Sequence, residues 1–242
     1  MSGPRPAFYA LGPGGWRDYV TLLHPPYTLW HLSYVAIGAA LAPELRVERL
    51  LLTLTAFALA LGVGAHALDE LRGRPLGTAI PGGALVALAV ASIGAAAAIG
   101  VWAALAWTAW LLVAVAAGTF LIVAYNLELF GGRFHTDAWF ALAWGAFPVL
   151  TAYLAVAERL APAAVAGAAF AALLSLAQRA LSTWVRTLRR RARTAQGWIE
   201  SADGSREELT LEALRAAPER ALRLLTAAVV ALAVALVLVR LL

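Results

Sequence analysis

Seven apolar stretches, each close to the length that a helix needs to cross a lipid bilayer, occupy most of this chain of 242 residues. A membrane-spanning helix needs about 20 mostly apolar residues. Hydrophobic residues make up 62% of the chain and charged residues 14%, whereas a soluble domain has about 25% charged residues. The stretches cover roughly residues 27–43, 50–68, 82–104, 106–126, 138–157, 161–181 and 221–240. The sequence therefore predicts an all-α, polytopic transmembrane helix bundle of about seven spans.

The same boundaries divide the chain into four segments. We expect an N-terminal cytoplasmic segment at 1–26, six spans at 27–181, a basic cytoplasmic loop at 182–220 and a last span at 221–242. The first apolar stretch is interpreted as a membrane helix, because the residues before it lack the compact apolar region and small-residue cleavage site of a signal peptide.

Three local patterns predict structure within the basic loop. The pair Asp203-Gly204 is typical of a turn. Ser205 and Glu208 have the spacing of a capping box, which predicts a short helix that begins there. Pro218 is expected to separate that helix from the last span, because proline interrupts the hydrogen bonds of a helix interior.

The distribution of basic residues predicts the orientation in the membrane. All 19 basic residues are arginines, and most of them fall in the N-terminal segment and in residues 69–81, 127–137 and 182–220. Because positively charged loops remain in the cytoplasm, these segments and the N-terminus are expected at the cytoplasmic face of the cell membrane. The chain has no cysteine, so disulfides and thiolate metal sites are excluded.

Polar residues gather at the same predicted face, most densely in the stretch "GAHALDELRGRPLGTAIP" at the end of the second span. His66, Asp69 and Arg72 are three residues apart, so a continuing helix would place them on one face. Ionisable side chains at membrane depth are costly, and those that are retained tend to line a cavity or pathway. Further polar residues at this depth are His24, His31, Glu70, Arg74, Tyr125, Asn126, Glu128, Arg133, His135 and Asp137. The sequence therefore predicts a polar pocket that opens to the cytoplasm.

Several of these residues also have a simpler interpretation. The charged residues at 70–74 are typical of a span end at the membrane interface. Thr136 and Asp137 are typical of a helix start, and His31 could bond to a neighbouring helix. The run "VRTLRRRAR" at 185–193 could anchor the chain to lipid headgroups or form a clamp for a diphosphate.

Three stretches in order resemble the UbiA-type intramembrane prenyltransferases. "LLHPPYTLWHLSYVAIGAALA" is similar to the first helix of that family, and "GVGAHALDELRGRPLGTAIP" falls at its first aspartate-rich motif. "AYNLELFGGRFHTDAWFALAWGAFPVLTAYL" is similar to the end of its fourth span and to its fifth. The resemblance covers about the first 155 residues. It implies a UbiA-like fold and, on balance, an enzyme that acts on an isoprenoid diphosphate at the cytoplasmic face.

The resemblance also implies roles for particular residues. Asp69 and Glu70 would hold Mg²⁺ against the diphosphate, and His66, Asp69 and Asp137 would be catalytic, with His66 or Asp137 taking the proton of the acceptor. The implied substrate-binding residues are Arg72, Arg74, Tyr125, Asn126, Arg133, His135, Arg179 and Arg186. The expected partner is a membrane lipid or polyprenyl substrate and not a nucleic acid. Terpene cyclisation and phosphoribosyl transfer to a polyprenyl phosphate stay open within the resemblance.

The sequence departs from the family pattern at both metal motifs. The first motif is shortened to Asp69 and Glu70, and the place of the second reads "AQRALSTWVRTLRRRARTAQG", without a carboxylate. The family usually has nine spans rather than seven. One interpretation is that Arg179, Arg186 and Arg189 replace the second metal cluster, because guanidinium groups match phosphate oxygens.

Two other classes of protein remain open. One is a membrane metalloprotein in which His31, His66, His135, Asp69 and Asp137 bind a transition metal, since imidazole and carboxylate suit iron or zinc. The other is a lipid-binding or scaffold protein without catalysis, which the missing second motif favours.

Overall fold

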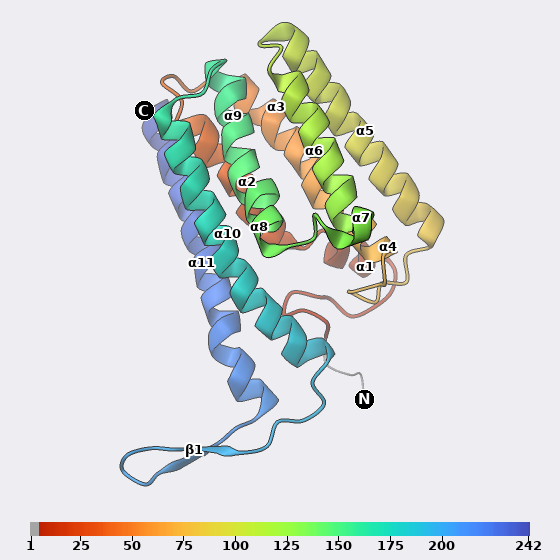
Figure 1. Ribbon diagram of the computed structural model, residues 1–242, viewed down its shortest axis with the longest axis vertical. Coiled ribbons are helices and arrows are strands. Elements are labelled where there is room, and N and C mark those ends of the chain that lie inside the picture. The colour runs from red at the N-terminus through yellow and green to blue at the C-terminus, as the bar shows by residue number, and fades with distance from the viewer. Residues whose placement is uncertain (1–4) are drawn as a thin grey trace.

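The computed structural model describes residues 5–242, which form a bundle of long helices and one short β-hairpin (Figure 1). Five helical stretches are long and apolar enough to cross a membrane: Val47–Leu71, Gly82–Ala106, Asp137–Ala157, Pro162–Arg190 and Leu211–Leu241. The prediction of an all-α membrane bundle is thus supported by the length and composition of the helices.

Two of these stretches contain a π-helical segment. The first consists of α3 (Val47–Phe57), η1 (Ala58–Ala65) and α4 (His66–Leu71), and the third of α8 (Asp137–Phe140), η2 (Ala141–Ala146) and α9 (Phe147–Ala157). The other three are α5 (Gly82–Ala106), α10 (Pro162–Arg190) and α11 (Leu211–Leu241). Short π-helical insertions are frequent at functional sites.

Two further helices of the bundle are shorter. The helices α2 (Pro25–Ala40) and α6 (Leu111–Asn126) have 16 residues each, below the length of about 20 that a perpendicular span needs. The described residues therefore contain five helices of spanning length, whereas seven spans were predicted. Helix α2 begins with Pro25 and Pro26 in its first turn, where the missing N–H groups of proline cost nothing.

The helices pack through small residues that let their backbones touch. A Cβ atom at Gly38 in α2 would lie 2.4 Å from the carbonyl oxygen of Val149 in α9. A Cβ atom at Gly145 in η2 would lie 2.7 Å from the carbonyl oxygen of Ala171 in α10. Close backbone approach at small residues is the usual way in which membrane helices associate, because lipid supplies little hydrophobic driving force between them.

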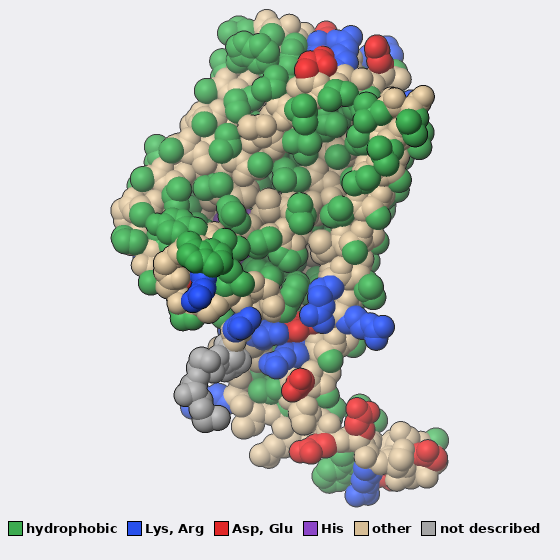
Figure 2. Space-filling model, turned by 180° about the vertical axis from the view of Figure 1, so that it is seen from behind, with side chains coloured by type: hydrophobic (Ala, Val, Ile, Leu, Met, Phe, Trp, Pro, Cys, Tyr) green, Lys and Arg blue, Asp and Glu red, His purple; other side chains and the backbone are tan. Residues whose placement is uncertain are grey.

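The outer surface of the bundle is apolar, as expected of a surface in contact with lipid. Large apolar side chains such as Leu105, Val165 and Leu173 are more than half exposed. Figure 2 shows hydrophobic side chains over most of the bundle, and arginines gathered near the narrow part where it meets the hairpin. Apolar patches of this extent on a monomer mark an interaction surface, here a membrane.

The segment at 182–220 differs from the prediction. Helix α10 continues to Arg190, and β1 (Trp198–Glu200) and β2 (Arg206–Glu208) form an antiparallel hairpin in place of the predicted short helix. The turn at Asp203-Gly204 is confirmed, because Gly204 closes it through its N–H bond to the carbonyl of Ser201. Since that turn pairs the flanking residues as strands, the capping box expected to begin at Ser205 does not form.

The predicted break at Pro218 is also wrong. Helix α11 begins after Thr210, whose side chain accepts a hydrogen bond from the N–H of Ala213, and it continues through Pro218. A proline in a helix removes one backbone hydrogen bond and strains the preceding turn. The packing of α11 along α2 and α10 is maintained over many residues, and the helix continues despite that local cost.

The N-terminal segment is tied to the end of the bundle. It contains α1 (Trp16–Leu22), and buried Asp18 in this helix accepts hydrogen bonds from the N–H groups of Gly14 and Ala79. At the end of α10, Arg189 and Arg190 donate to the backbone carbonyls of Arg5 and Pro6. These contacts place residues 6–9 across one end of the bundle.

Candidate functional site

A polar cavity of about 430 Å³ lies where the N-terminal segment, α4, the end of α6 and the end of α10 meet. Eight of the site residues predicted from the sequence line it: His66, Asp69, Arg72, Tyr125, Asn126, His135, Arg179 and Arg186. His66 and Asp69 of α4 and Arg72, which directly follows that helix, all line the cavity, as their spacing predicts. Residues more than 100 positions apart in the sequence thus meet at one cavity.

Four predicted site residues lie elsewhere, and Glu70 is the most informative of them. Its side chain is buried and points into the loop after α4. One carboxylate oxygen accepts from the N–H of Leu76 at 2.9 Å, and the other accepts from the N–H and hydroxyl of Thr78 at 2.8 and 2.9 Å. Both oxygens are therefore committed to holding the loop, and Glu70 is not part of the cavity wall.

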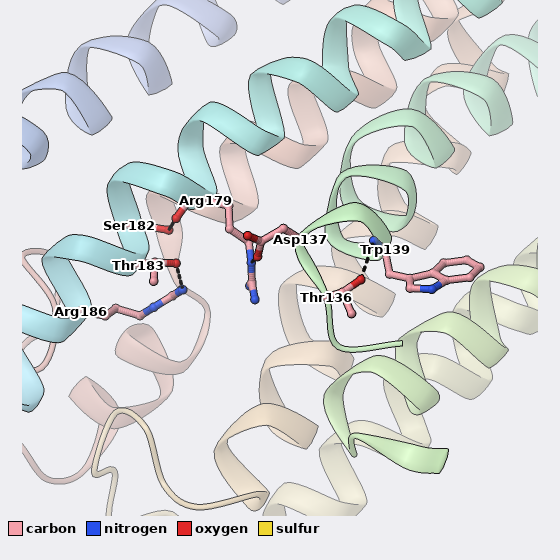
Figure 3. A network of polar contacts seen from close by, with 7 residues as sticks. All are labelled: Thr136, Asp137, Trp139, Arg179, Ser182, Thr183 and Arg186. Carbon is pink, nitrogen blue, oxygen red and sulfur yellow. Dashed lines mark hydrogen bonds and ion pairs between the residues drawn. The ribbon is translucent and has the colours of Figure 1, made fainter. Parts of the chain in front are cut away.

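The other three lie at the margins of the site. Arg74 donates to the backbone carbonyls of Thr78 and Ile80, and so stabilises the same loop. Arg133 is exposed and does not line the cavity. Asp137 is exposed at the start of α8, after Thr136 caps that helix as expected, and its carboxylate lies 2.5 Å from Nε of Arg179 (Figure 3).

Arginines form one wall of the cavity. Arg179, Arg186, Arg190 and Arg191 line it from α10 and the residue that follows that helix, and Arg72 lines it from the residue that follows α4. Among the described residues, Arg72 pairs with Glu128, while Arg186 bonds only the hydroxyl of Thr183 (Figure 3). We call this wall, formed by Arg179, Arg186, Arg190 and Arg191, the arginine wall.

The positive charge of this wall is only partly balanced. Within residues 5–242, Arg186, Arg190 and Arg191 form no ion pair, and Asp69 is the one cavity carboxylate that is also unpaired. Arg189, which was predicted to contact a diphosphate, instead forms a buried pair with Glu219 at 2.5 Å. The cavity therefore carries a net positive charge and is suited to bind an anion.

Histidine and tyrosine side chains form another part of the cavity lining. The hydroxyl of Tyr9 lies 2.7 Å from Nδ1 of His24, and the His24 and His66 rings are stacked with centroids 4.1 Å apart. His31 and His135 also line the cavity, and the His135 ring is stacked on Tyr125 at 4.4 Å. We call the wall formed by His24, His31, His66 and His135 the histidine wall.

Three buried polar atoms have no hydrogen-bond partner within the described residues, and all three belong to side chains that line this cavity. They are Nε2 of His24, the hydroxyl of Tyr125 and Oε1 of Gln178. A buried polar atom without a partner costs about 1–3 kcal/mol, so such atoms are rarely left without a function. Their concentration at one place indicates that the cavity binds a polar molecule.

The charges at the other end of the bundle are arranged differently. There Glu158 lies 3.1 Å from Arg46 and 2.8 Å from Arg49, and Arg49 also donates to the carbonyl of Ala155. The guanidinium group of Arg49 lies over the ring of Trp107. These charged groups pair with one another and hold the helix ends together, so this end of the bundle is not a second anion site.

An apolar crevice adjoins the polar cavity. It has a volume of about 100 Å³ and is lined by side chains of α3, η1, α5, α6 and the η2–α9 helix, among them Ile93, Val115, Phe147 and Trp144. Trp144 lines both spaces. A molecule with a polar head and an apolar tail would match this succession of surfaces.

Burial in this cavity changes the pKa of two groups outside the long helices. Burial lowers the pKa of His24 well below its ordinary value of 6.5, and the positive potential of His66, Arg190 and Arg186 lowers it further. Burial also raises the pKa of the Tyr9 hydroxyl well above 10.0. Both side chains are therefore uncharged at neutral pH.

The lowered pKa of His24 predicts a pH dependence of stability. Below pH 6.5 the unfolded chain binds a proton at His24 that the folded chain does not, so stability decreases as the pH falls from about 7. One such proton accounts for at most about 1.4 kcal/mol per pH unit. The unfolding midpoint in detergent, followed by tryptophan fluorescence at pH 7.5 and 5.0, should fall less in His24→Asn than in the wild type. Asparagine suits the positive φ of 46° at this position, and an unchanged pH slope would contradict the assignment.

Sequence reasoning missed several residues that line the cavity. Tyr9 and Tyr27 carry no pattern that would have indicated them. Gln178, Ser182 and Arg190, by contrast, are spaced in steps of four around Arg186 on α10, and all line the cavity. That helical spacing was a usable signal, because residues four apart lie on one face.

No family model matches the chain, and neither the curated proteins nor the solved structures include a significant match. The described residues also contain no group of three or more His, Asp or Glu side chains placed to hold a metal ion. The metalloprotein alternative therefore has no support in this geometry.

Proposed function

We propose that this protein is an integral membrane, UbiA-like prenyltransferase-type protein that binds an isoprenoid diphosphate in the polar cavity. The observation that carries the proposal is the arginine wall, whose members Arg186, Arg190 and Arg191 lack acidic partners within the described residues. Guanidinium groups bind phosphate oxygens through paired hydrogen bonds, which are among the strongest in proteins. The adjoining crevice would take the first part of the apolar chain.

The proposed arrangement in the membrane includes seven spans. Helices α2 and α6 lie alongside the longer helices in Figure 1, and a bundle that counts them crosses seven times. The N- and C-terminal ends of the described chain lie at opposite ends of the bundle in Figure 1, as an odd number of crossings requires. With the arginine-rich end in the cytoplasm, the cavity faces the cytoplasm.

The residues present do not fit the pair of Mg²⁺ sites that the family resemblance implies. Glu70 uses both of its oxygens to hold the loop after α4, and Asp69 is the one unpaired carboxylate in the cavity wall. Mg²⁺ is normally held by one or two carboxylates together with phosphate oxygens and water. The positive charge that faces the diphosphate would therefore come from the arginines.

The proposed chemistry is the ionisation of an allylic diphosphate. When the bond between the allylic carbon and the diphosphate oxygen breaks, negative charge develops on the leaving group. Fixed positive groups aimed at that charge stabilise the transition state, and Arg179, Arg186 and Arg190 would supply them. Residues 6–9 of the N-terminal segment line the cavity and would limit access of water to the carbocation.

Binding of geranylgeranyl diphosphate to the purified protein in detergent tests the proposal. We expect saturable binding that is at least tenfold tighter than that of geranylgeraniol, because the alcohol lacks the groups that bind the arginine wall. Binding should persist in EDTA. Equal affinity for the two compounds, or no binding of either, would contradict the proposal. If the two compounds bind equally and no acceptor is turned over, the lipid-binding or scaffold alternative is favoured. Iron or zinc bound to the purified protein would favour the metalloprotein alternative.

A further inference from the structure

Two members of the histidine wall, His31 and His66, present hydrogen-bond acceptors to the cavity. Nδ1 of His31 lies 2.9 Å from the carbonyl oxygen of Trp144, and Nδ1 of His66 lies 3.1 Å from that of Gly62. Nδ1 of His135 lies 3.0 Å from the carbonyl oxygen of Tyr125. A carbonyl oxygen can only accept a hydrogen bond, so each of these Nδ1 atoms must carry the proton.

The local backbone provides the carbonyl oxygens that determine these proton positions. In η2, the carbonyl of Trp144 cannot bond to the residue four positions later, because Pro148 has no N–H. That carbonyl is therefore available to His31, which lies on the neighbouring helix α2. Tyr125 lies in the last turn of α6, and its carbonyl accepts from the N–H of Glu128 beyond the helix as well as from His135.

With the proton on Nδ1, the neutral imidazole has a lone pair on Nε2. Within the described residues, Nε2 of His31 and Nε2 of His66 have no hydrogen-bond partner, and both side chains line the cavity. Oε1 of Gln178, also an acceptor, is buried without a partner in the same cavity. Phosphate oxygens are acceptors too, so they gain nothing from these two imidazoles. The two walls therefore suit opposite kinds of ligand group.

We infer that the histidine wall is a binding site for a hydroxyl-bearing molecule, whose O–H groups donate to Nε2 of His31 and Nε2 of His66. Binding of a hydroxyl-bearing molecule follows from the tautomers of the histidines alone. The role of this wall as the acceptor site of a transferase rests on the proposed function. The hydroxyl-bearing molecule would then share the cavity with the diphosphate held by the arginine wall.

The corresponding transfer step is balanced without any further reactant. The bond between the allylic carbon and the diphosphate oxygen breaks, and its electron pair leaves with the diphosphate. The hydroxyl oxygen forms a bond to that carbon. Its proton passes to the Nε2 atom that had accepted its hydrogen bond, here that of His66 or His31. An imidazole with a free Nε2 lone pair can accept that proton.

Nitrogen NMR of the histidine-labelled protein in detergent tests the inference. The chain has four histidines, so single replacements assign every imidazole signal. We expect His31 and His66 to be protonated at Nδ1 and not at Nε2. Glycerol should shift both Nε2 signals in a saturable way, whereas its trimethyl ether, which has the same skeleton without O–H groups, should not. Protonation of Nε2 in the free protein, or equal effects of glycerol and the ether, would overturn the inference.

A variant and a second ligand separate this inference from the proposed function. His66→Phe keeps an aromatic ring against His24 but removes Nε2, and it should weaken glycerol binding about fivefold, the effect of one hydrogen bond between neutral groups. The shift at His31 in the wild type provides the same test if this variant does not fold. Inorganic diphosphate, titrated into the same sample, reports on the arginine wall. Glycerol shifts without diphosphate binding would contradict the proposed function alone, and diphosphate binding without glycerol shifts would contradict this inference alone.

Discussion

Replacing Arg186 by glutamine is expected to weaken the binding of geranylgeranyl diphosphate by at least tenfold. Arg186 lines the cavity and forms no ion pair within the described residues, and its one side-chain partner is Thr183 on the same helix. Its charge is therefore available to a ligand. A hydrogen bond to a charged group contributes about 1.5–3 kcal/mol, which corresponds to a factor of about 10 to 150 in affinity.

Arg133 provides the matched control for this experiment. Its side chain is exposed and does not line the cavity, although the sequence predicted it to contact the substrate. Arg133→Gln removes the same charge from the same end of the molecule, and we expect less than a twofold change in the dissociation constant. Equal losses in the two variants would mean that general electrostatic attraction, and not the arginine wall, accounts for binding. Measuring both variants at two salt concentrations separates these cases, because attraction between exposed charges is screened by salt.

Replacing Glu70 by alanine is expected to destabilise the fold by about 3 kcal/mol or more. The change leaves the N–H groups of Leu76 and Thr78 and the hydroxyl of Thr78 without their acceptor. Each of these is a hydrogen bond to a buried charged group, and the donors would be left in a site that solvent scarcely reaches. The measurement is the midpoint of thermal unfolding in detergent, followed by tryptophan fluorescence and by size-exclusion chromatography.

The neighbouring carboxylate, Asp69, is the control for Glu70. Asp69 lines the cavity and forms no ion pair or side-chain hydrogen bond within the described residues, so Asp69→Asn should change stability by less than about 0.5 kcal/mol. The two adjacent acidic residues are thus expected to differ in their effect on stability, because Glu70 holds the loop and Asp69 faces the ligand. If Glu70→Ala remained as stable as Asp69→Asn but lost metal-dependent ligand binding, the assignment of Glu70 to the loop would be wrong.

Periodic features of the sequence were sufficient to predict the helical bundle and part of the site. Apolar blocks located the long helices, and the spacing of His66, Asp69 and Arg72 grouped these side chains, which all line the cavity. The direction of Glu70 could not be predicted in this way. The direction of this side chain depends on the path of the loop at 72–81. That path is determined by a contact with Asp18, which is distant in the sequence, and by a contact with Thr78, which follows no regular spacing.

The basic run at the end of α10 illustrates a second limit. Adjacent arginines on a helix point in directions about 100° apart, so Arg189 and Arg190 have different neighbours. Arg189 forms its pair with Glu219 of α11, while Arg190 lines the cavity. Which member of such a run contacts the ligand depends on where α11 lies, and nothing local in the sequence determines that. The hairpin at 198–208 was missed because its turn also fits the start of a helix.

The contacts between Arg189, Arg190 and the backbone of residues 5 and 6 join parts of the chain that are 184 positions apart. A chain that is inserted into the membrane from its N-terminus completes α10, which ends at Arg190, only after more than three quarters of its 242 residues have been synthesised. Until then, residues 6–9 have no arginine to hold them, and the arginine wall does not exist. The cavity is therefore among the last parts of the molecule to be completed, and a nascent bundle can enter the bilayer well before it can bind its ligand.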